Sequence, residues 1–392
     1  MLPAFQKLLD EQHWKRASQN LVRKRRPREE GTLPLVKING RTLINFCGND
    51  YLGLSAHETV INAAKAALDK FGFGSGASQL VSGYTILHRQ LEEALAEKTG
   101  RDRALVFSTG YMANQAIING LMGRGDLVAG DRFNHASLID AAIISRARFK
   151  RYPHCDTAVL TTLLNQHNKG KKMIVTDAVF SMDGDIAPLE ELSAIGKQHE
   201  ALLVVDDAHG FGVLGKSGCG ALEEQGLGQA DVPLMMATFG KALGGFGAFV
   251  AGDADLIEAL TQTSRTLIYT TAPPPAIAAA ALAALELLGT EPWRRTKLRE
   301  LITQFIRGAT ERGIPLSGSD TAIQPIIQGS AESALNASQY LLEQGFWIAP
   351  IRPPTVPAGT SRLRVTLTAG HEPAQVDALL ESLAIALEKC RN

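Results

Sequence analysis

The chain has 392 residues, of which 45% are hydrophobic and 20% charged, and its formal net charge is zero. A chain of this length can bury the cores of two or more domains, and its composition is that of a soluble globular enzyme. Zero net charge argues against a protein that binds polyanions with its whole surface. No apolar run reaches transmembrane length, and the first ten residues lack the apolar core of a signal peptide.

The four cysteines, Cys47, Cys155, Cys219 and Cys390, are scattered and form no CxxC pair. This spacing argues against a zinc site and against a disulfide scaffold, and it suits a reducing cytosol. The segment 183–185 lacks the spacing of a calcium-binding loop. We therefore expect a cytoplasmic protein without a bound metal.

Residues 1 to about 30 are basic and are expected to be helical, with the helix ending near Arg26 because Pro27 follows. A solvated helix face is one interpretation of this run, and a nucleic-acid-binding tail is another. The zero net charge and the lack of stacking aromatic residues disfavour the second interpretation. A hairpin is expected around Asn39-Gly40, a favourable pair for a type I′ turn.

The main body opens at Asn49, with helices expected over 58–71 and 87–99 and a flexible loop over 72–78. A buried strand is expected over 103–107. The turn that follows is rich in small residues, and helical periodicity resumes at Ala113. Such a turn presents free backbone N–H groups and suits a phosphate. An ordinary strand-to-helix turn explains the same residues equally well.

Strands and helices then alternate along the chain. Strands are expected over 127–129, 172–176, 201–205 and 232–237, and helices over 137–145 and 189–200. This alternation predicts an α/β fold with a mostly parallel sheet covered on both faces.

Polar side chains follow several of these strands. Asp206 and His209 follow strand 201–205, His135 follows strand 127–129, and Ser181 follows strand 172–176. Because ligands bind at the carboxyl ends of strands in open α/β sheets, we expect these residues at one edge. The alternative is a helix-capping Asp and solvated histidines.

Lys241 lies among small and hydroxyl residues in the segment 237–245. Flanking glycines leave its amine uncrowded, and poor hydration favours the neutral amine that a Schiff base needs. A glycine-rich turn with a surface lysine is the simpler interpretation of this segment alone. The joint occurrence of Lys241 and Asp206 favours pyridoxal phosphate (PLP), which needs a lysine for its aldehyde and an acid for its pyridinium nitrogen.

Three prolines at 273–275 suggest a domain junction. The rest of the chain predicts helices over 276–288, 294–312, 331–344 and 372–389, and strands over 323–328, 346–351 and 362–368. We therefore expect an N-terminal segment 1–48, a cofactor-binding large domain 49–285 and a small α/β domain 286–392. Arg362 and Arg364 share one strand face, where either a substrate carboxylate or a surface ion pair is their partner.

Seven motifs resemble those of the α-oxoamine synthases, which are fold-type I, aspartate aminotransferase-like PLP enzymes, and the resemblance covers nearly the whole chain. The motifs are NDYLGL (49–54), GSGASQLVSGY (74–84), STGYMANQ (108–115), DRFNHASL (131–138), FSMDGDIAPL (180–189), VDDAHGFGVLG (205–215) and TFGKALGG (238–245). The resemblance implies a large domain with a mostly parallel sheet and a smaller C-terminal α/β domain.

The resemblance also implies roles for single residues. Lys241 forms the Schiff base and removes a proton, Asp206 pairs with the pyridinium nitrogen, and His135 stacks on the ring. The implied cofactor contacts are Gly110, Tyr111, His135, Ser181, Asp206, His209, Thr238 and Lys241. The implied substrate contacts are Arg23, His135, Thr355 and Arg364, the last with the amino-acid carboxylate.

Within the family, the segments 351–372 and 82–84 are most similar to the member of biotin biosynthesis that condenses L-alanine with a pimeloyl thioester, carried by coenzyme A or a carrier protein. A synthase for another amino acid or thioester is the nearest alternative. A non-catalytic partner subunit would lack the Schiff-base lysine, so Lys241 disfavours it. The segment 269–271 resembles one that, in this fold, reaches the cofactor phosphate bound by the partner chain. This resemblance implies a homodimer with shared active sites.

Overall fold

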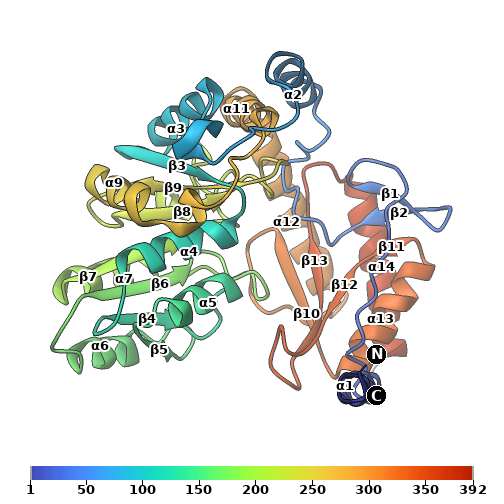
Figure 1. Ribbon diagram of the computed structural model, residues 1–392. Helices are drawn as coiled ribbons and strands as arrows, with labels where there is room; N and C mark the ends of the chain where they lie inside the picture. Colours follow the sequence, from blue (N-terminus) through green and yellow to red (C-terminus); the bar gives the residue numbers. More distant parts are fainter. Residues whose placement is uncertain (1, 391–392) are drawn as a thin grey trace. The chain divides into compact units, whose positions relative to one another are not determined.

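The computed structural model describes residues 2–390 of the chain. These residues form two compact units (Figure 1). Within the described residues, unit 1 contains 2–49, 182–185 and 296–390, and unit 2 contains 50–181 and 186–295. The expected division into 1–48, 49–285 and 286–392 stays a prediction.

A seven-stranded sheet forms the centre of unit 2. In spatial order its strands are β3 (Arg103–Phe107), β9 (Ala248–Gly252), β8 (Leu234–Thr238), β7 (Ala201–Asp206), β6 (Lys172–Asp177), β4 (Leu127–Asp131) and β5 (Arg148–Tyr152). Strand β9 is antiparallel to both of its neighbours, and the other strands run parallel to one another. The predicted mostly parallel sheet is confirmed.

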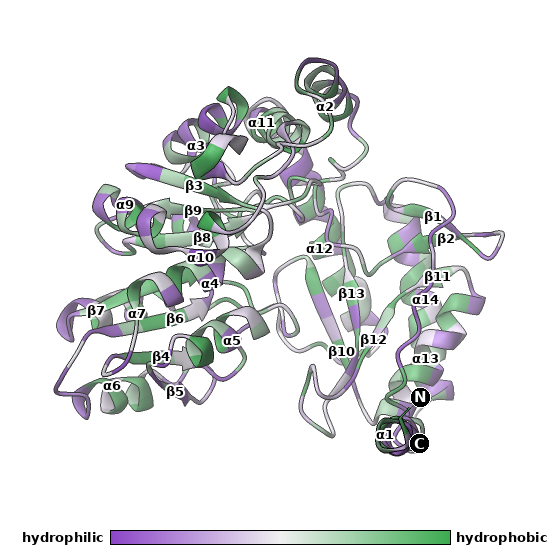
Figure 2. Ribbon diagram, in the orientation of Figure 1, coloured by the Kyte–Doolittle hydropathy of each residue, from purple (hydrophilic) through white to green (hydrophobic). Residues whose placement is uncertain are grey.

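The strands of this sheet are nearly continuous apolar runs because helices pack on it. Every residue of β4 and β9 is buried, and Figure 2 shows hydrophobic colouring along much of the sheet. The helices of unit 2 are α2 (Glu58–Phe71), the π-helix η1 (Gln79–Gly83), α3 (Ile86–Thr99), α4 (Gly110–Leu121), α5 (Ala136–Ile144), α6 (Thr157–Asn165), α7 (Leu189–Gln198), α8 (Ala221–Glu224), α9 (Ala254–Thr263), α10 (Arg265–Ile268) and α11 (Pro275–Thr290). Helix α4 packs on β3, β8 and β9, and α7 packs on β7.

Unit 1 contains two three-stranded sheets. One sheet joins β1 (Leu35–Ile38), β2 (Arg41–Asn45) and β11 (Phe346–Trp347), and the other joins β10 (Ile323–Gly329), β13 (Ser361–Thr366) and β12 (Ala349–Ile351). Its helices are α1 (Pro3–Ser18), α13 (Ala331–Glu343), α14 (Pro373–Lys389) and most of α12 (Trp293–Glu311). The turn between β1 and β2 has positive φ at Asn39 and Gly40, which confirms the predicted type I′ hairpin.

The expected N-terminal helix ends earlier than predicted, at Ser18 rather than near Arg26. Asn20 takes a left-handed φ of 57°, and the amide of Leu21 donates to the carbonyl oxygen of Arg16 at 2.8 Å. This is the Schellman pattern, in which an asparagine replaces the usual glycine. The basic residues 23–28 are therefore not helical.

Other differences concern elements with weak apolar patterns. The edge strand β5 carries Arg148, Lys150 and Arg151 on largely exposed positions, so its sequence does not resemble a buried strand. Helices α6 and α9 were not predicted. The expected strand 346–351 is divided between β11 and β12, which lie in different sheets. Helix α4 begins at Gly110, three residues before the predicted start.

Over residues 2–390, no single helix is long and apolar enough to cross a membrane. Helices α11 and α12 pass that test of length and composition only as a pair, and they are bent by 73° at the break between them.

Candidate active site

Three carboxylates end adjacent parallel strands of unit 2. Asp131 is the last residue of β4, Asp177 of β6 and Asp206 of β7, and Asp177 is paired with Asp206 in the sheet register. Burial, together with the charge of Asp206, raises the pKa of Asp177 well above its usual value. Asp206 was predicted from the sequence and Asp177 was not, although each is the last residue of a buried strand.

Asp206 is only 5% exposed and is held by neutral donors. Its Oδ2 accepts a hydrogen bond from the Asn114 side-chain amide at 2.8 Å, and its Oδ1 accepts one from the Ala208 amide at 3.0 Å. Asn114 comes from α4 and also donates to the Ser137 hydroxyl at 2.8 Å. A buried carboxylate in this environment is suited to a cationic ligand atom.

His135 lies at the N-cap of α5, and the charge of Asp206 acts on its side chain. Its Nδ1 is 2.8 Å from the Ser137 hydroxyl, and its backbone amide donates to Asp177 at 2.8 Å. Burial lowers the pKa of His135, an effect that the charge of Asp206 opposes and that of Lys241 reinforces. The ring is thus biased toward its neutral form, which suits stacking on a flat ligand.

Lys241 is half-buried in the turn after β8. Its carbonyl oxygen accepts a hydrogen bond from Gly244 at 2.9 Å, and Gly244 has a φ of +63°. A Cβ at Gly244 would lie 2.2 Å from the Ser55 amide nitrogen, so only glycine fits there. The charge of Lys241 affects the pKa values of His135, Asp177 and Asp207, so its amine lies close to this acidic edge.

His209 and Asp207, which flank Ala208, have different environments. The Nδ1 of half-buried His209 is 2.7 Å from the Tyr51 hydroxyl, which fixes the ring. Asp207 is fully buried, and its Oδ2 accepts a hydrogen bond from the Ala221 amide at 2.8 Å. Burial raises the pKa of Asp207 well above its usual value. Asp207 therefore holds a backbone segment, and Asp206 is the better partner for a ligand.

The predicted phosphate cradle is the N-terminus of α4. Thr109 caps the helix by accepting from the Met112 amide at 3.2 Å, and Gly110 and Tyr111 form the first turn. The first-turn amides have no acceptor within the helix, and the dipole there is positive. The Tyr111 hydroxyl donates to Asp140, and this hydrogen bond raises the Tyr111 pKa.

Thr238 and Ser181 are half-buried; Thr238 is the last residue of β8, and Ser181 follows β6. The Thr238 hydroxyl donates to the Gly247 carbonyl oxygen at 2.7 Å and accepts from the Gly240 amide at 3.2 Å. Thr238 therefore shapes the Lys241 turn in addition to any contact with a ligand.

The two predicted arginines of β13 have different partners in unit 1. Arg362 forms an ion pair with Asp183 and also donates to the Met182 carbonyl oxygen at 3.1 Å. Arg364 is 6% exposed, and its Nη1 lies 3.3 Å from the side-chain oxygen of Asn49. Arg362 thus pairs with a carboxylate of the chain itself, and Arg364 stays the predicted contact for a substrate carboxylate.

Arg23 and Thr355 meet in unit 1 although 332 residues separate them. The Arg23 Nη2 donates to the Thr355 hydroxyl at 3.3 Å. Both line a small pocket of about 100 Å³ together with Leu21, Ile351 and Arg352. Arg352 donates to the carbonyl oxygens of Asn20 and Val22, so the chain around Arg23 is tied to the segment that carries Thr355.

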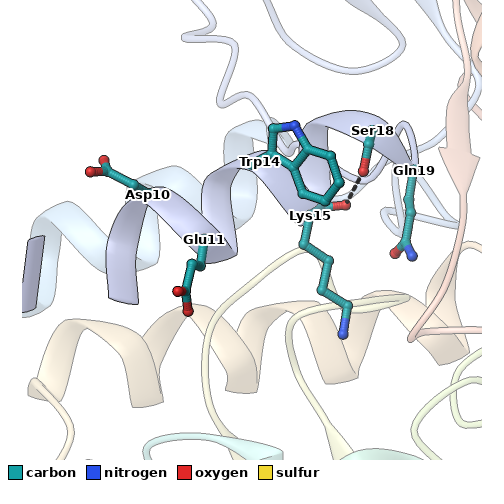
Figure 3. A pocket seen from close by; sticks show the side chains of 6 residues that line it. All are labelled: Asp10, Glu11, Trp14, Lys15, Ser18 and Gln19. Atoms are coloured by element: carbon teal, nitrogen blue, oxygen red, sulfur yellow. Dashed lines mark hydrogen bonds between the residues drawn. The ribbon is translucent and has the colours of Figure 1, made fainter. Parts of the chain in front are cut away.

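A second hollow, of about 700 Å³, lies along α1 (Figure 3). Its lining residues are Asp10, Glu11, Trp14, Lys15, Ser18 and Gln19. All of them belong to α1 or to its C-cap, Gln19, and the helix has no buried residue. A single exposed helix cannot enclose a small molecule, so we assign no ligand to this hollow.

Comparison with known proteins decides the family. Residues 41–383 match the model of aminotransferase class I and II. The 8-amino-7-oxononanoate synthase of Saccharophagus degradans is 55% identical over 351 residues, which are 89% of this chain and 88% of that protein. The chain belongs to the 8-amino-7-oxononanoate synthases.

Solved structures agree with this assignment. A serine palmitoyltransferase from S. paucimobilis with a bound PLP–myriocin adduct has a TM-score of 0.93 and 33% identity, covering 100% of this chain and 99% of that one. An 8-amino-7-oxononanoate synthase from Francisella tularensis has a TM-score of 0.78 and 33% identity, covering 88% and 98%. As a member of the 8-amino-7-oxononanoate synthases, the chain is a PLP-dependent acyltransferase of fold type I, as the sequence predicted.

The residues present fit PLP. Asp206 offers a buried carboxylate to the pyridinium nitrogen, and Lys241 offers a primary amine at the same edge. The N-terminus of α4 offers amide donors that suit a phosphate. When bound, PLP supplies an electron sink for the carbanion that forms at the substrate Cα.

Proposed function

We propose that this chain condenses L-alanine with a pimeloyl thioester, releasing CO₂ and the free carrier and giving 8-amino-7-oxononanoate for biotin synthesis. The observation that carries the proposal is the gathering of Lys241, Asp206 and His135 at one sheet edge, with the charges of Lys241 and Asp206 both acting on His135. The 55% identity to the 8-amino-7-oxononanoate synthase of S. degradans supports the choice of reaction.

The proposed roles follow from the chemistry of each side chain. Lys241 carries the cofactor covalently and then holds the proton that leaves the alanine Cα. Asp206 keeps a proton on the pyridine nitrogen, because a buried carboxylate favours a cation beside it. His135, biased toward its neutral form, stacks on the ring and contacts the substrate.

The remaining cofactor contacts are proposed from their positions at the same edge. His209, fixed by Tyr51, hydrogen-bonds the phenolic oxygen of the ring. Gly110 and Tyr111 lie against the cofactor at the N-terminus of α4, and Ser181 and Thr238 hydrogen-bond around the ring and the phosphate, where the Thr238 hydroxyl would exchange its Gly247 acceptor for the cofactor.

The proposed substrate contacts come from unit 1. Arg364 binds the alanine carboxylate, because its buried guanidinium can form two parallel hydrogen bonds with a carboxylate. Arg23 and Thr355 contact the acyl thioester, and the exposed basic residues around Arg23 attract an anionic carrier, either coenzyme A or a carrier protein.

We also propose a homodimer whose partner chain contributes to each phosphate site. Phe73, Val81 and Tyr269 are 85%, 79% and 70% exposed, and such large apolar side chains are typical of an interface. Ser78 and Thr271 form a β-bridge, which joins the two segments that carry these residues. Light scattering is expected to show a dimer, and Val81→Asp is expected to give inactive monomer. An active monomer in the unmodified protein would contradict this part of the proposal.

We place the enzyme in the cytoplasm on the basis of its cysteines. All four are free within the described residues, which suits a reducing compartment. Activity confined to the soluble fraction of a cell lysate is expected, and activity that sediments with membranes would contradict it.

The cofactor assignment is tested by reduction with borohydride. Treatment is expected to abolish the visible absorption of the holoenzyme and to leave a pyridoxyl group on one peptide, which mass spectrometry then identifies as the peptide containing Lys241. A pyridoxyl group on another lysine would overturn the assignment of the Schiff-base residue.

A serine-using synthase is the second candidate, because the serine palmitoyltransferase fold superposes with a TM-score of 0.93. The sequence relatives favour alanine, since the synthase of S. degradans is 55% identical and the palmitoyltransferase 33%. Incubation with either amino acid and either pimeloyl-CoA or palmitoyl-CoA distinguishes the two by the mass of the product.

A further inference from the structure

Asp131, His154 and Cys155 form a cluster of unlike metal-ligating side chains in unit 2. Asp131 ends β4, whereas His154 and Cys155 follow the end of the neighbouring strand β5. The ligand atoms of the three side chains all lie within 4.8 Å of one another. The proposed reaction uses none of these residues.

Two of the three ligand separations in this cluster are close to those around a single tetrahedral ion. The His154 Nδ1 lies 3.1 Å from the Asp131 Oδ1 and 3.8 Å from the Cys155 Sγ. Zinc bonds of about 2.3 Å to sulfur and about 2.1 Å to nitrogen or oxygen, at tetrahedral angles, place the ligand atoms roughly 3.6 Å and 3.4 Å apart, respectively. These two separations differ from the ideal values by a few tenths of an ångström. The Cys155 Sγ is also 3.8 Å from the His154 Nε2, so binding requires a rotation of the Cys155 side chain toward an ion on Nδ1.

The surroundings hold two of the ligands in place. The Asp131 carboxylate is 1% exposed and accepts hydrogen bonds from the amides of Phe133 at 2.7 Å and Cys155 at 2.8 Å. The His154 ring stacks on Phe133 with 4.5 Å between centroids and meets Phe180 edge-on at 4.4 Å. Ligands fixed in this way lose little conformational entropy when they bind an ion.

The charge and softness of the donors favour zinc. A carboxylate and a thiolate together neutralise a divalent cation, while the imidazole adds a neutral nitrogen. We propose that Asp131, His154 and Cys155 bind one zinc ion, with water as the fourth ligand. Binding forms a Zn–S bond and releases the thiol proton of Cys155 to solvent. The His154 side chain is 24% exposed, so an ion can enter from that side.

The prediction of no zinc site rested only on the spacing of the cysteines. Cysteine spacing does not reveal a site that has a single cysteine. The partners of that cysteine here are a neighbouring histidine and a carboxylate from another strand. Phe133 lies two residues before His135, and Phe180 directly precedes Ser181. The ion would therefore lie among side chains that adjoin the proposed cofactor edge.

The test uses chelator-treated holoenzyme incubated with zinc chloride and then dialysed. About one zinc ion per chain is expected to remain, and zinc is expected to protect Cys155 from alkylation, as read by peptide mass spectrometry. Magnesium, which prefers oxygen ligands, is expected to give neither effect. Unchanged alkylation of Cys155 in the presence of zinc would overturn the proposal, and this result does not require any variant to fold.

Variants provide the matched comparison. Cys155→Ser and His154→Gln are each expected to weaken zinc binding at least about tenfold, since loss of even an outer partner costs that much. Cys219→Ser is the control, because the Cys219 Sγ donates to the Lys98 carbonyl oxygen at 2.8 Å, outside the cluster. Zinc binding that survives in Cys155→Ser but is lost in Cys219→Ser would place the ion elsewhere and contradict the assignment.

Discussion

The side-chain amide of Asn114 donates a 2.8 Å hydrogen bond to the buried carboxylate of Asp206 and thereby joins helix α4 to the end of strand β7. Helix α4 also carries the proposed phosphate site at its N-terminus. The two proposed contacts, one for the ring nitrogen and one for the phosphate, are therefore linked through one helix.

Asp206→Asn is expected to slow exchange of the alanine α-proton with solvent by roughly 10- to 150-fold, the equivalent of one hydrogen bond to a charged group. The asparagine keeps the shape but cannot balance a pyridinium charge. Asn114→Ala should have a smaller effect in the same direction, because Asp206 remains. Exchange is measured by NMR of L-alanine in heavy water.

Asp207→Asn is the matched control for that experiment. Its carboxylate accepts from the Ala221 amide and is fully buried, so we expect lower stability with near-normal exchange in the protein that folds. If Asp206→Asn exchanges at the unmodified rate while Asp207→Asn does not, the ring partner is Asp207.

Lys241→Ala is expected to leave a folded protein that holds the cofactor weakly and loses at least about 100-fold in turnover, the contribution typical of a positioned acid–base group. Lys65→Ala, which removes an exposed amine from α2, should behave like the unmodified enzyme. Steady-state rates and circular dichroism of both variants are the measurements. Substantial turnover by purified Lys241→Ala would remove this lysine from the mechanism.

Arg23→Ala is expected to raise the KM for the acyl thioester and to leave the KM for alanine nearly unchanged, because the Arg23–Thr355 contact lies at the proposed acyl site. The part of the effect that comes from long-range attraction should shrink with added salt, since exposed charges are screened beyond about 8 Å at physiological ionic strength.

Arg25→Ala removes the same charge from an exposed neighbour for which the described chain shows no hydrogen bond. Arg25→Ala should reproduce the salt-dependent part of the rise in KM for the acyl thioester. It should not reproduce the part that comes from the Arg23–Thr355 contact. Equal changes in both KM values for Arg23→Ala would return Arg23 to the role of a solvated surface residue.

Glu92 gives a prediction about stability and pH. It is 8% exposed, accepts from the Tyr84 hydroxyl at 2.6 Å, and burial raises its pKa from 4.5 to about 7. The folded state therefore holds this proton more tightly than the unfolded chain does. The resulting stability is fully present below pH 4.5 and is lost as the pH rises through about 7.

Glu92→Gln cannot titrate and should lack this dependence. Between pH 4.5 and 7, the unmodified protein should lose up to about 3 kcal/mol of unfolding free energy relative to Glu92→Gln. Glu93→Gln, at an exposed ion pair with Arg89, is the control and should follow the unmodified protein. Denaturant melts across this pH range provide the comparison, and parallel curves for all three proteins would contradict the prediction.

Much of the fold follows from local patterns in the sequence. The parallel strands were predictable because β6 and β7 are buried apolar runs ending in a polar residue. Strand β5 escaped prediction because an edge strand needs little apolar surface, and three of its five residues are exposed. The early end of α1 depends on one residue, Asn20, in a conformation that sequence alone rarely reveals.

The candidate site was predictable where a residue carries its own chemistry and not where it acts through a distant partner. Lys241 and Asp206 lie in motifs whose residue types suggest a cofactor. Asn114 looked like an ordinary helix residue, since its partner Asp206 lies 92 residues away. Asp177 and the Asp131–His154–Cys155 cluster depend in the same way on which strands become neighbours in the sheet.

The most direct test of the account is the identity of the product formed from L-alanine and pimeloyl-CoA. The unmodified enzyme should yield 8-amino-7-oxononanoate with release of one CO₂ and one free thiol per turnover, as measured by mass spectrometry and thiol titration. Lys241→Ala should yield none. A faster reaction with serine or glycine in place of alanine, or with palmitoyl-CoA in place of pimeloyl-CoA, would contradict the proposed function.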